Sequence, residues 1–208
     1  MRRTKAEAAE TREEIFRAGI RVFAEKGYAA GTLADVARAA GVTRGAIYWH
    51  FENKKAFLGE MVTRLTRAYD ELLEIARNSG KEPAHAIELA VEQIILRFAR
   101  DGEFRALQEL MMITMVSQGD LLERDEQLRS PDETKAISVL ADAIRRNQLH
   151  GGWSPLTALH SIEAVIMGVF MMIRDGKLDP TDEEIRQLAA FVRRGITPAA
   201  EHKGDRNA

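Results

Sequence analysis

The stretch TLADVARAAGVTRGAIYWHF, residues 32–51, decides the fold of the N-terminal part of this chain. Its pattern predicts two short helices joined by a tight turn, which is a helix-turn-helix. Thr32 can cap the first helix, with Asp35 at the third helical position, near the positive end of the helix dipole. Gly41 supplies the left-handed backbone conformation that commonly ends a helix, so we expect the first helix to stop there.

The second helix has an outward face that suits DNA better than solvent. Thr43 can cap this helix, which we expect to run from Arg44 to about Phe51, with Ile47 and Phe51 buried. The residues left outward are Arg44, Gly45, Tyr48, Trp49 and His50. Arginine can read guanine edges, glycine lets the backbone come close, and tyrosine and histidine can donate to phosphates. The sequence therefore predicts a recognition helix for the major groove; the alternative is an αα-hairpin packed in a core with its aromatic rings buried.

The charge is distributed unevenly along the chain. The net charge of −2 argues, by itself, against binding to nucleic acid. Residues 1–67, however, hold thirteen Lys and Arg against eight Asp and Glu, a balance of +5 that leaves −7 on the remainder. A basic N-terminal part on an acidic remainder is the distribution expected of a DNA-binding protein, and a merely solvated surface is the alternative.

Outside the helix-turn-helix the chain shows helical periodicity only, and we expect nine helices in an all-α fold. The first helix carries Ile15 and Val22 at helical spacing and should end at Gly27. The later helices are expected over residues 54–77, 83–100, 103–117, 131–150, 155–175 and 182–197, each bounded by Gly, Pro or a capping residue. A capping box over residues 130–133 would start the helix 131–150 at Pro131; alternatively residues 121–129 are helical too and Pro131 is a kink or break.

Basic residues flank the helix-turn-helix on both sides. The RRTK segment at residues 2–5 forms either an arm that reaches phosphate or the minor groove, or a frayed and solvated terminus. Asn53 can cap the fourth helix, whose first turn carries Lys54 and Lys55, where positive charge is unfavourable to the helix dipole. A phosphate bound at that helix N-terminus would accommodate both lysines.

Three segments of the N-terminal quarter to third of the chain carry a family resemblance. They are the leader RRTKAEAAETREEI (2–15), the segment FAEKGYAAGTLADVARAAG (23–41) and the string VTRGAIYWHFENK (42–54). Together they resemble the N-terminal domain of TetR-family transcriptional regulators, most of all the AcrR-type repressors of multidrug efflux genes. The resemblance implies a helix-turn-helix DNA-binding domain over residues 1–53, a helical ligand-binding and dimerisation domain over residues 54–200, and a polar tail over residues 201–208.

The resemblance also implies roles for single residues. The residues expected to bind DNA are Thr32, Thr43, Arg44, Gly45, Tyr48, Trp49, His50 and Lys54. Among them Thr43 would hold a phosphate at the N-terminus of the recognition helix, and Arg44 and Gly45 would meet base edges. The DNA backbone would be contacted by Tyr48, His50 and Lys54.

The partners implied are a palindromic double-stranded DNA operator and a second copy of the chain. In this family the last two helices form a four-helix bundle across a two-fold axis. The segment 155–175 fits such an interface because it is apolar on more than one face, with Ala164 and Gly168 as small residues among large ones. The alternative is that this helix is central in a monomeric core.

Methionines are concentrated in two helices of the predicted ligand-binding domain. Flexible, polarisable methionines suit a pocket for small apolar or amphipathic molecules, and filling of core gaps is the alternative. The candidate pocket residues are Tyr69, Phe98, Gln108, Met111, Met112, Met115, Trp153, Met167, Phe170 and Met171. Efflux repressors of this subgroup often carry polar and charged residues where this chain reads MMITMV (111–116), so their ligand contacts are not transferred to it. We expect a repressor that such a molecule releases from DNA, with control of efflux genes as one role.

The composition argues against several other classes of protein. The absence of cysteine excludes disulfides, thiolate catalysis and cysteine-based zinc sites. The sequence has neither an apolar run of membrane-spanning length nor a secretory leader, so we expect a cytoplasmic protein. The five histidines lack metal-ligand spacing, and we expect no catalysis, cofactor or metal. Two alternatives stay open: a DNA-binding regulator without a small-molecule ligand, and a small-molecule-binding α-protein or enzyme whose helix-turn-helix is incidental.

Overall fold

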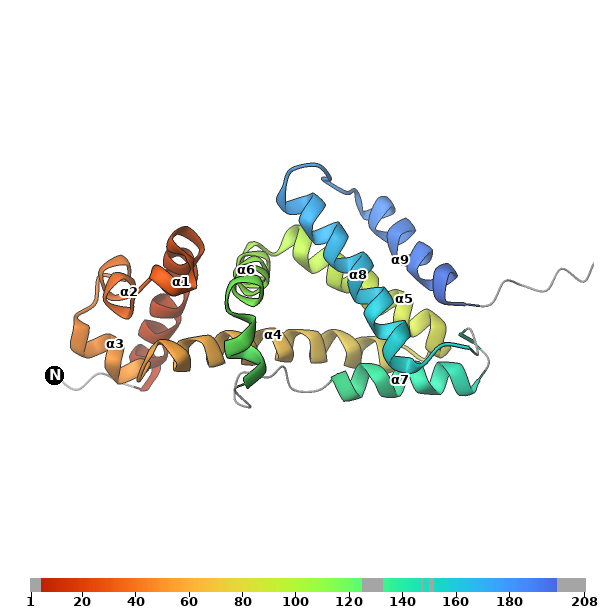
Figure 1. The fold of residues 1–208 in the computed structure, drawn as a ribbon, viewed down its shortest axis with the longest axis horizontal. Helices are drawn as coiled ribbons and strands as arrows, with labels where there is room; N and C mark the ends of the chain where they lie inside the picture. Colours follow the sequence, from red (N-terminus) through yellow and green to blue (C-terminus); the bar gives the residue numbers. More distant parts are fainter. Residues whose placement is uncertain (1–4, 125–132, 147, 150–151, 198–208) are drawn as a thin grey trace, which may run out of the picture. The chain divides into compact units, whose positions relative to one another are not determined.

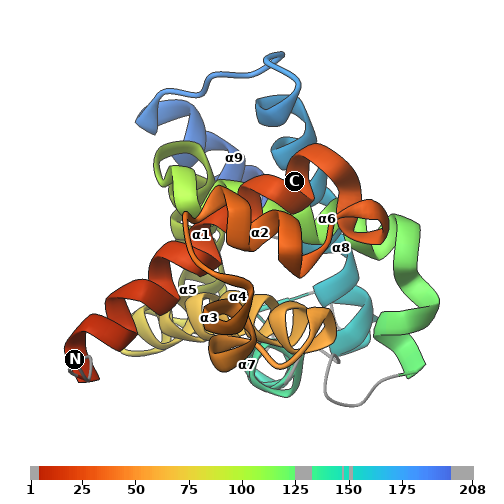
Figure 2. The ribbon, with the colours of Figure 1, turned by 90° about the vertical axis from the view of Figure 1, so that its left-hand side faces the viewer.

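The helix-turn-helix predicted over residues 32–51 is present in the computed structural model of the chain, which describes residues 5–124, 133–146, 148–149 and 152–197 (Figure 1). Helix α2 spans Leu33–Ala39 and α3 spans Arg44–His50. Figure 2 shows them as two short helices joined by a tight turn. Gly41 lies in that turn with φ +66°, a conformation that glycine adopts without the steric cost of a Cβ atom.

Two hydroxyls begin these two helices, as the sequence predicted. The Thr32 hydroxyl accepts a hydrogen bond from the Asp35 amide, and the Asp35 carboxylate accepts one from the Thr32 amide, each over 3.1 Å. The Thr43 hydroxyl accepts from the Ala46 amide, also over 3.1 Å. Each cap satisfies an amide that would otherwise lack a partner within the helix, and such a cap typically stabilises a helix by about 1 kcal/mol.

The described residues form nine α-helices and no strand, which confirms the all-α fold. Besides α2 and α3 they are α1 (Lys5–Ala30), α4 (Lys54–Arg77), α5 (Pro83–Arg100), α6 (Gly102–Arg124), α7 (Glu133–Arg145), α8 (Pro155–Arg174) and α9 (Asp182–Ile196). The predicted cap of α4 is confirmed, because the Asn53 side chain accepts from the amide of Ala56. Ser154 and Thr181 cap α8 and α9 in the same way, each accepting from the amide three residues further on.

Two predicted helix ends were wrong, and the predicted break at Gly27 is confirmed. The backbone of α1 leaves the helical conformation at Gly27, with φ 76°, and one further helical turn follows to Ala30. α6 runs past Gly119 to Arg124, because one helical glycine costs only about 1 kcal/mol and does not stop a helix alone. α7 ends at Arg145 rather than before Gly151; the Gln148 amide donates to the Ala143 carbonyl over 2.9 Å, which closes the helix end.

Two sequence predictions fall wholly or partly outside the described residues. The expected capping box at residues 130–133 lies mostly in the segment 125–132, and so does most of the alternative helix 121–129, of which residues 121–124 belong to α6. Of the proposed N-terminal arm, Arg2 and Arg3 also lie outside, whereas Lys5 is the first residue of α1. Lys5 is therefore part of a helix and not of an extended arm.

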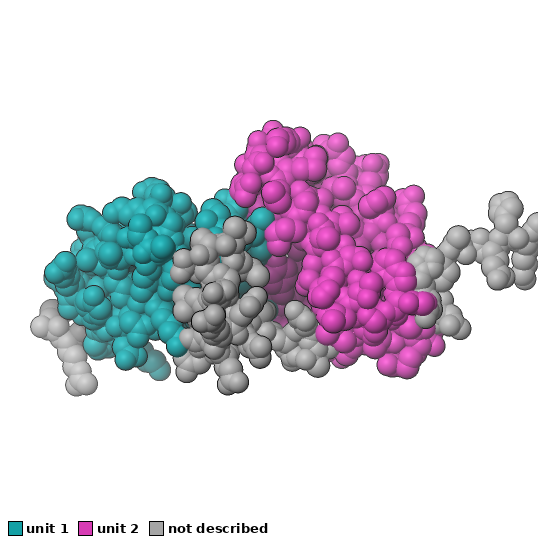
Figure 3. Space-filling view, viewed as in Figure 1, with its two compact units in different colours: residues 1–68, 100–131 teal, residues 69–99, 132–208 magenta. Residues whose placement is uncertain are grey.

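The chain divides into two compact units, which Figure 3 shows in two colours. Unit 1 comprises residues 1–68 and 100–131, and unit 2 comprises residues 69–99 and 132–208. Helix α4 is continuous from Lys54 to Arg77, so its first part belongs to unit 1 and its last part to unit 2.

The core of unit 1 is aromatic and centres on Phe57, at the start of α4. The ring centroid of Phe57 lies 5.1 Å from that of Phe16, 5.2 Å from that of Phe23 and 5.0 Å from that of Phe51. Phe16 and Phe23 come from α1, and Phe51 follows the last residue of α3. Helix α6 also packs on α1. This cluster fixes α3 against α1 and the beginning of α4, so the outward face of α3 has a rigid support.

In unit 2, α8 packs against α7 and α9. Its Phe170 ring stacks on the Phe98 ring of α5, with centroids 3.9 Å apart, and both side chains are fully buried. Arg193 of α9 donates to Glu88 of α5 over 2.7 Å. These contacts leave one face of α8 and one face of α9 outside the core of the unit.

Helix α8 is long and apolar enough to cross a membrane by length and composition alone. The sequence expectation concerned an uninterrupted apolar run, and none occurs in α8, because Thr157, His160 and Glu163 interrupt it. A core helix of a soluble protein passes the same test, and α8 contributes Ala158, Ile162 and Phe170 to the core of unit 2. The exposed face of α8 is also apolar, so we expect another surface to cover it. That surface can be a protein chain as well as a membrane.

Candidate nucleic-acid interface

Helix α3 buries one side and exposes the residues that the sequence predicted to face DNA. Ile47 is fully buried, and Phe51 beyond it is 2% exposed. On the other side Tyr48 is 52% exposed and Trp49 is 73% exposed, which makes Trp49 the most exposed large apolar side chain described. Because a solvated helix face gains nothing from two exposed aromatic rings, this face has the composition of a binding surface.

The remaining predicted contacts of α3 share this face or border it. Thr43, Arg44 and Gly45 are exposed at the helix N-terminus, and His50 is half-buried at its end. The His50 ring lies edge-on to the Trp49 ring, with centroids 4.6 Å apart. The alternative interpretation of the motif, a hairpin with its aromatics buried in a core, is therefore wrong for Tyr48 and Trp49.

Gly45 has no internal reason to be glycine. A Cβ atom built there would meet only the Thr43 Oγ, at 3.9 Å, and the backbone is not in the left-handed region. Glycine inside a helix is nevertheless less favourable than alanine by about 0.5–1 kcal/mol. Gly45 differs in this from Gly19 and Gly31, where a Cβ would collide with the rings of Phe57 and Phe23, so the surface of α3 is open at Gly45.

Thr32 and its cap partner are held by a small cluster of charges. Asp35 accepts from Lys26 of α1 over 2.8 Å and also pairs with Arg38. The hydrogen bonds from Lys26 and Thr32 hold the pKa of the Asp35 carboxyl well below its usual range. The Thr32 hydroxyl also donates to this carboxylate over 2.8 Å, so its first role is to begin α2.

The Lys54 side chain folds back against the protein and does not extend into solvent. Its ammonium donates to the Ala29 carbonyl over 2.9 Å and lies 4.5 Å from the centre of the Tyr28 ring. Burial lowers the pKa of Lys54, and burial also raises the pKa of Tyr28 to about 12. The Tyr28 hydroxyl donates in turn to the Lys54 carbonyl over 3.2 Å. Lys54 therefore ties the end of α1 to the start of α4, a role that the sequence did not reveal.

Comparisons with known proteins agree with this geometry. The family model of the bacterial regulatory proteins of the tetR family matches residues 15–61. The HTH-type transcriptional repressor BepR of Brucella suis biovar 1 (strain 1330) is 36% identical over 177 residues, which cover 81% of this chain and 82% of BepR. The chain belongs to the TetR family.

Two further relatives extend the likeness over most of this TetR-family chain. The HTH-type transcriptional regulator TtgR of Pseudomonas putida is 37% identical over 155 residues, which cover 73% of the chain and 74% of TtgR. The crystal structure of NalD, the secondary repressor of the MexAB-OprM multidrug efflux pump in Pseudomonas aeruginosa, matches with a TM-score of 0.70 at 27% identity. That match covers 94% of this chain and all of the NalD chain.

The predicted resemblance is thus confirmed, and the TetR-family chain is a DNA-binding transcriptional regulator. Regulators of this family bind DNA operators and small-molecule effectors, typically as dimers. The matched residues 15–61 contain most of α1, both helices of the motif and the first two turns of α4. The interface built on α3 therefore lies within the part of the chain that carries the family signature.

The residues predicted to line an effector pocket in this TetR-family regulator are divided between the two units. In unit 1, Gln108 and Met111 are buried and Met112 is partly buried, while the side chain of Met115 lies outside the described residues. In unit 2, Phe98 and Phe170 form the buried stack, and Met171 is 45% exposed.

Three further pocket candidates, Tyr69, Trp153 and Met167, are partly buried in unit 2. Burial and the carboxylate of Glu163 raise the pKa of Tyr69 well above its usual value. A pocket that combines these residues stays a prediction. Among the described residues no group of three or more His, Asp or Glu side chains could hold a metal ion.

Proposed function

We propose that α3 reads the operator from the major groove with its N-terminal end. Arg44 and Gly45 approach base edges, and the Thr43 end of the helix, with its free amides, holds a phosphate. Tyr48, Trp49 and His50 lie against the DNA backbone. The observation that carries the proposal is the exposed face of α3, on which 73% of Trp49 and 52% of Tyr48 are accessible while Ile47 opposite is fully buried.

Lys54 has a double role in this proposal. An ammonium has three hydrogens, and the Ala29 carbonyl takes one of them. A phosphate at the N-terminus of α4 would take another and would also satisfy amides of that helix end. Residues 1–53 then form the DNA-binding domain, and residues 54–200 bind the effector and dimerise.

A symmetric dimer formed by α8 and α9 fits the same proposal. The faces of these helices that lie outside the core of unit 2 carry Met171, Met172 and Phe191, which are 45%, 45% and 64% exposed. Gly168 is exposed in the middle of α8, and a Cβ atom there would meet nothing within 4 Å. A second copy of α8 and α9 would cover the apolar side chains and approach the backbone at Gly168.

The proposed protein is a repressor that a small apolar or amphipathic molecule releases from its operator, and multidrug efflux genes are the proposed targets. The efflux assignment is supported by the 27% identity to NalD over 94% of this chain. The effector would favour a conformation of residues 54–200 that moves the two DNA-binding domains out of operator register. A coupling free energy of about 1–3 kcal/mol would weaken operator binding roughly 5- to 150-fold. The proposed site of action is the cytoplasm, where the operator lies.

The first test is the selection of duplexes from a random or genomic library at physiological salt. The purified chain is compared with an Arg44→Ala, Tyr48→Ala double variant, whose far-UV circular dichroism reports that it is folded. The proposal expects a palindrome that the chain recovers and the variant loses. Recovery of the same sequences by both proteins, or of none by either, contradicts it.

The second test concerns the effector. Thermal unfolding is measured across a panel of lipophilic compounds, and each compound that raises the melting temperature is added to the chain bound to its selected operator. An effector must do both: stabilise the protein and lower operator affinity. A panel that shifts neither quantity would favour a regulator without a small-molecule ligand.

A further inference from the structure

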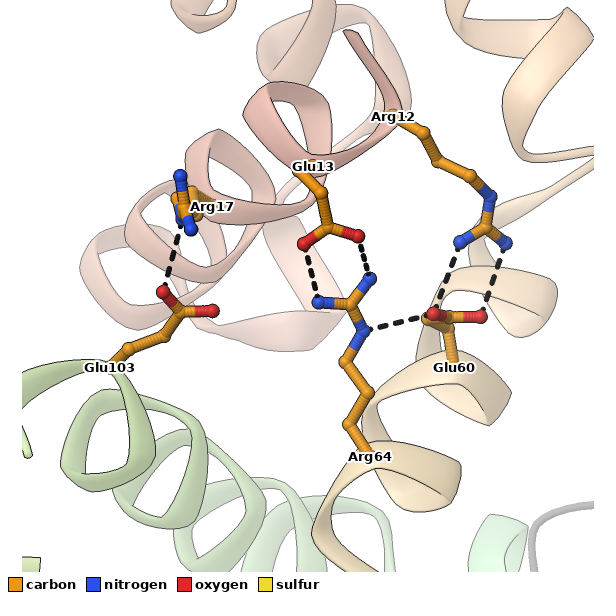
Figure 4. A network of polar contacts seen from close by, with 6 residues as sticks. All are labelled: Arg12, Glu13, Arg17, Glu60, Arg64 and Glu103. Atoms are coloured by element: carbon orange, nitrogen blue, oxygen red, sulfur yellow. Dashed lines mark hydrogen bonds and ion pairs between the residues drawn. The ribbon is translucent and has the colours of Figure 1, made fainter. Parts of the chain in front are cut away.

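A network of charged side chains lies beside the recognition helix in unit 1. Figure 4 shows it spanning three helices, and its members are Arg12, Glu13 and Arg17 of α1, Glu60 and Arg64 of α4, and Glu103 of α6. Three arginines and three glutamates make the network neutral. None of these residues lies on α3, and the proposed DNA contacts do not include them.

Arg64 is the centre of this network. Its two terminal nitrogens donate to the two carboxylate oxygens of Glu13 over 2.8 and 2.5 Å, and its Nε donates to Glu60 over 2.9 Å. The guanidinium also lies 3.8 Å from the centre of the buried Phe16 ring. The hydrogen bond from Arg64 is the main cause of a lowered pKa at Glu13. Arg64 thereby fastens α1 to α4 with the flat, two-pronged geometry that lysine cannot reproduce.

Arg12 extends the network to the end of the recognition helix. Its two terminal nitrogens lie 3.0 and 3.1 Å from the two oxygens of Glu60. Its guanidinium lies 4.7 Å from the centre of the Phe51 ring. Burial alone would raise the pKa of Glu60, but hydrogen bonds from Arg12 and Arg64 outweigh it and the pKa is lowered.

Phe51 is the residue on which α3 ends. Its amide donates to the Ile47 carbonyl over 2.8 Å, and its ring is buried 5.0 Å from the Phe57 ring. Because α3 has only seven residues, a small tilt at Phe51 displaces the exposed face of the whole helix. The Arg12 guanidinium covers the Phe51 ring and is itself held by Glu60 of α4, so it restrains this tilt.

We propose that Arg12 is a positioning residue for operator recognition, acting through Phe51 on the orientation of α3 and held in place by Glu60 and Arg64. This inference rests on the proposed function of α3. Base readout needs hydrogen bonds of defined direction, whereas attraction to phosphates tolerates displacement. Loss of Arg12 therefore weakens specific binding, and it changes non-specific binding only as much as the loss of any one nearby positive charge does.

The test compares Arg12→Met with Arg17→Met in the full-length chain. Both variants remove one positive charge and one arginine–glutamate pair from α1, but Arg17 pairs with Glu103 and does not cover Phe51. Affinity is measured for the selected operator and for a scrambled duplex across a range of salt concentrations. Circular dichroism at the assay temperature confirms that each variant is folded, since unfolding would lower both affinities in the same proportion.

The expected result for Arg12→Met is a loss of operator affinity of about 5- to 150-fold, the cost of one mismatched base pair. Affinity for the scrambled duplex and the salt dependence should match those of Arg17→Met. Equal operator affinities for the two variants would overturn the proposal. The proposal would also be overturned if Arg12→Met lowered the affinity for both duplexes by the same factor and reduced the slope of log affinity against log salt concentration by about 0.9. That result would identify Arg12 as a phosphate contact.

A second variant, Glu60→Gln, tests the same restraint from the other side. It keeps the shape of the side chain but removes the charge that holds Arg12 and Arg64. We expect a similar loss of operator affinity, and a double variant with Arg12→Met that loses less than the sum of the two effects. Additive effects, or wild-type affinity for Glu60→Gln, would overturn the role of the network. Failure of the unaltered chain to select any operator would instead contradict the proposed function.

Discussion

The ring of Phe57 occupies the space that a side chain on Gly19 would need. A Cβ atom on Gly19 would lie 2.2 Å from the ring Cζ atom, far inside van der Waals contact. The ring has no room to retreat because Phe16, Phe23 and Phe51 surround it. The glycine thus allows α1 and α4 to approach closely enough to form the aromatic core beneath α3.

Gly19→Ala should therefore destabilise the protein by about 1–3 kcal/mol, the usual cost of overpacking a core. Urea unfolding followed by circular dichroism measures the change. The control is Gly102→Ala, because a Cβ atom on Gly102 at the start of α6 would meet nothing within 4 Å. Equal free energies of unfolding for the two variants would mean that α1 and α4 move apart to accommodate the added methyl group at little energetic cost.

Gly45→Ala should separate stability from DNA binding. The substitution adds a methyl group in open space and improves helix propensity, so the free energy of unfolding should rise by about 0.5–1 kcal/mol. Operator affinity should fall, because the methyl group occupies the place where DNA approaches the backbone. Denaturation and duplex titration of the same preparation check both changes. A variant that is more stable and binds the operator as well as before would remove Gly45 from the interface.

Ionisation of Tyr28 should make the free energy of unfolding fall with rising pH in the alkaline range. Burial raises its pKa to about 12, above the value of about 10 expected in the unfolded chain. A group whose pKa is raised on folding favours the folded state below its unfolded pKa, so this contribution is complete below about pH 10 and is lost as the pH rises toward 12.

The measurement is the free energy of unfolding of the chain and of Tyr28→Phe between about pH 8 and pH 12. The variant keeps the ring that contacts Lys54 but has no hydroxyl to ionise. The unaltered chain should lose stability more steeply over the upper half of this range. Since Tyr69 also has a raised pKa and is present in both proteins, the difference between the two curves isolates Tyr28. Parallel curves would show that Tyr28 ionises as freely in the folded chain as in the unfolded one.

The sequence predicted features that depend on neighbouring residues. The caps at Thr32, Thr43 and Asn53 follow from a side-chain oxygen and an amide three positions away, so local spacing was enough to find them. The outward face of α3 was predictable for the same reason, because helical periodicity separates Ile47 from Tyr48 and Trp49. These parts of the site lie on one short segment, and no tertiary contact is needed to describe them.

The features that were missed depend on residues far apart in the chain. Arg12 and Glu60 are 48 positions apart, and nothing local marks either as half of an ion pair. The core position of Phe57 was not predicted, because the surroundings of the first turn of α4 are set by α1 and α3. In each case the deciding energy comes from packing, which a single sequence does not display.

Phe191 is the residue on which the proposed dimer depends most. The buried side of α9 consists of Ile185, Ala189, Val192 and Ile196. Phe191 lies away from this side, 64% exposed, on a helix whose other exposed residues include Arg186 and Arg194. Covering a phenylalanine side chain contributes about 1.5–3 kcal/mol, and two-fold symmetry covers it twice.

Phe191→Glu should accordingly raise the dimer dissociation constant at least about 100-fold and leave the fold of each subunit intact. Sedimentation velocity over a range of concentrations measures the first effect, and circular dichroism checks the second. The control is Ile75→Glu, which places the same charge on a side chain of α4 that is 55% exposed and should leave the dimer unchanged. Operator affinity should fall with dimerisation, because a palindrome is read by two α3 helices at once and a monomer holds only one half-site. A variant that remains dimeric at every concentration would place the two-fold axis elsewhere on the molecule.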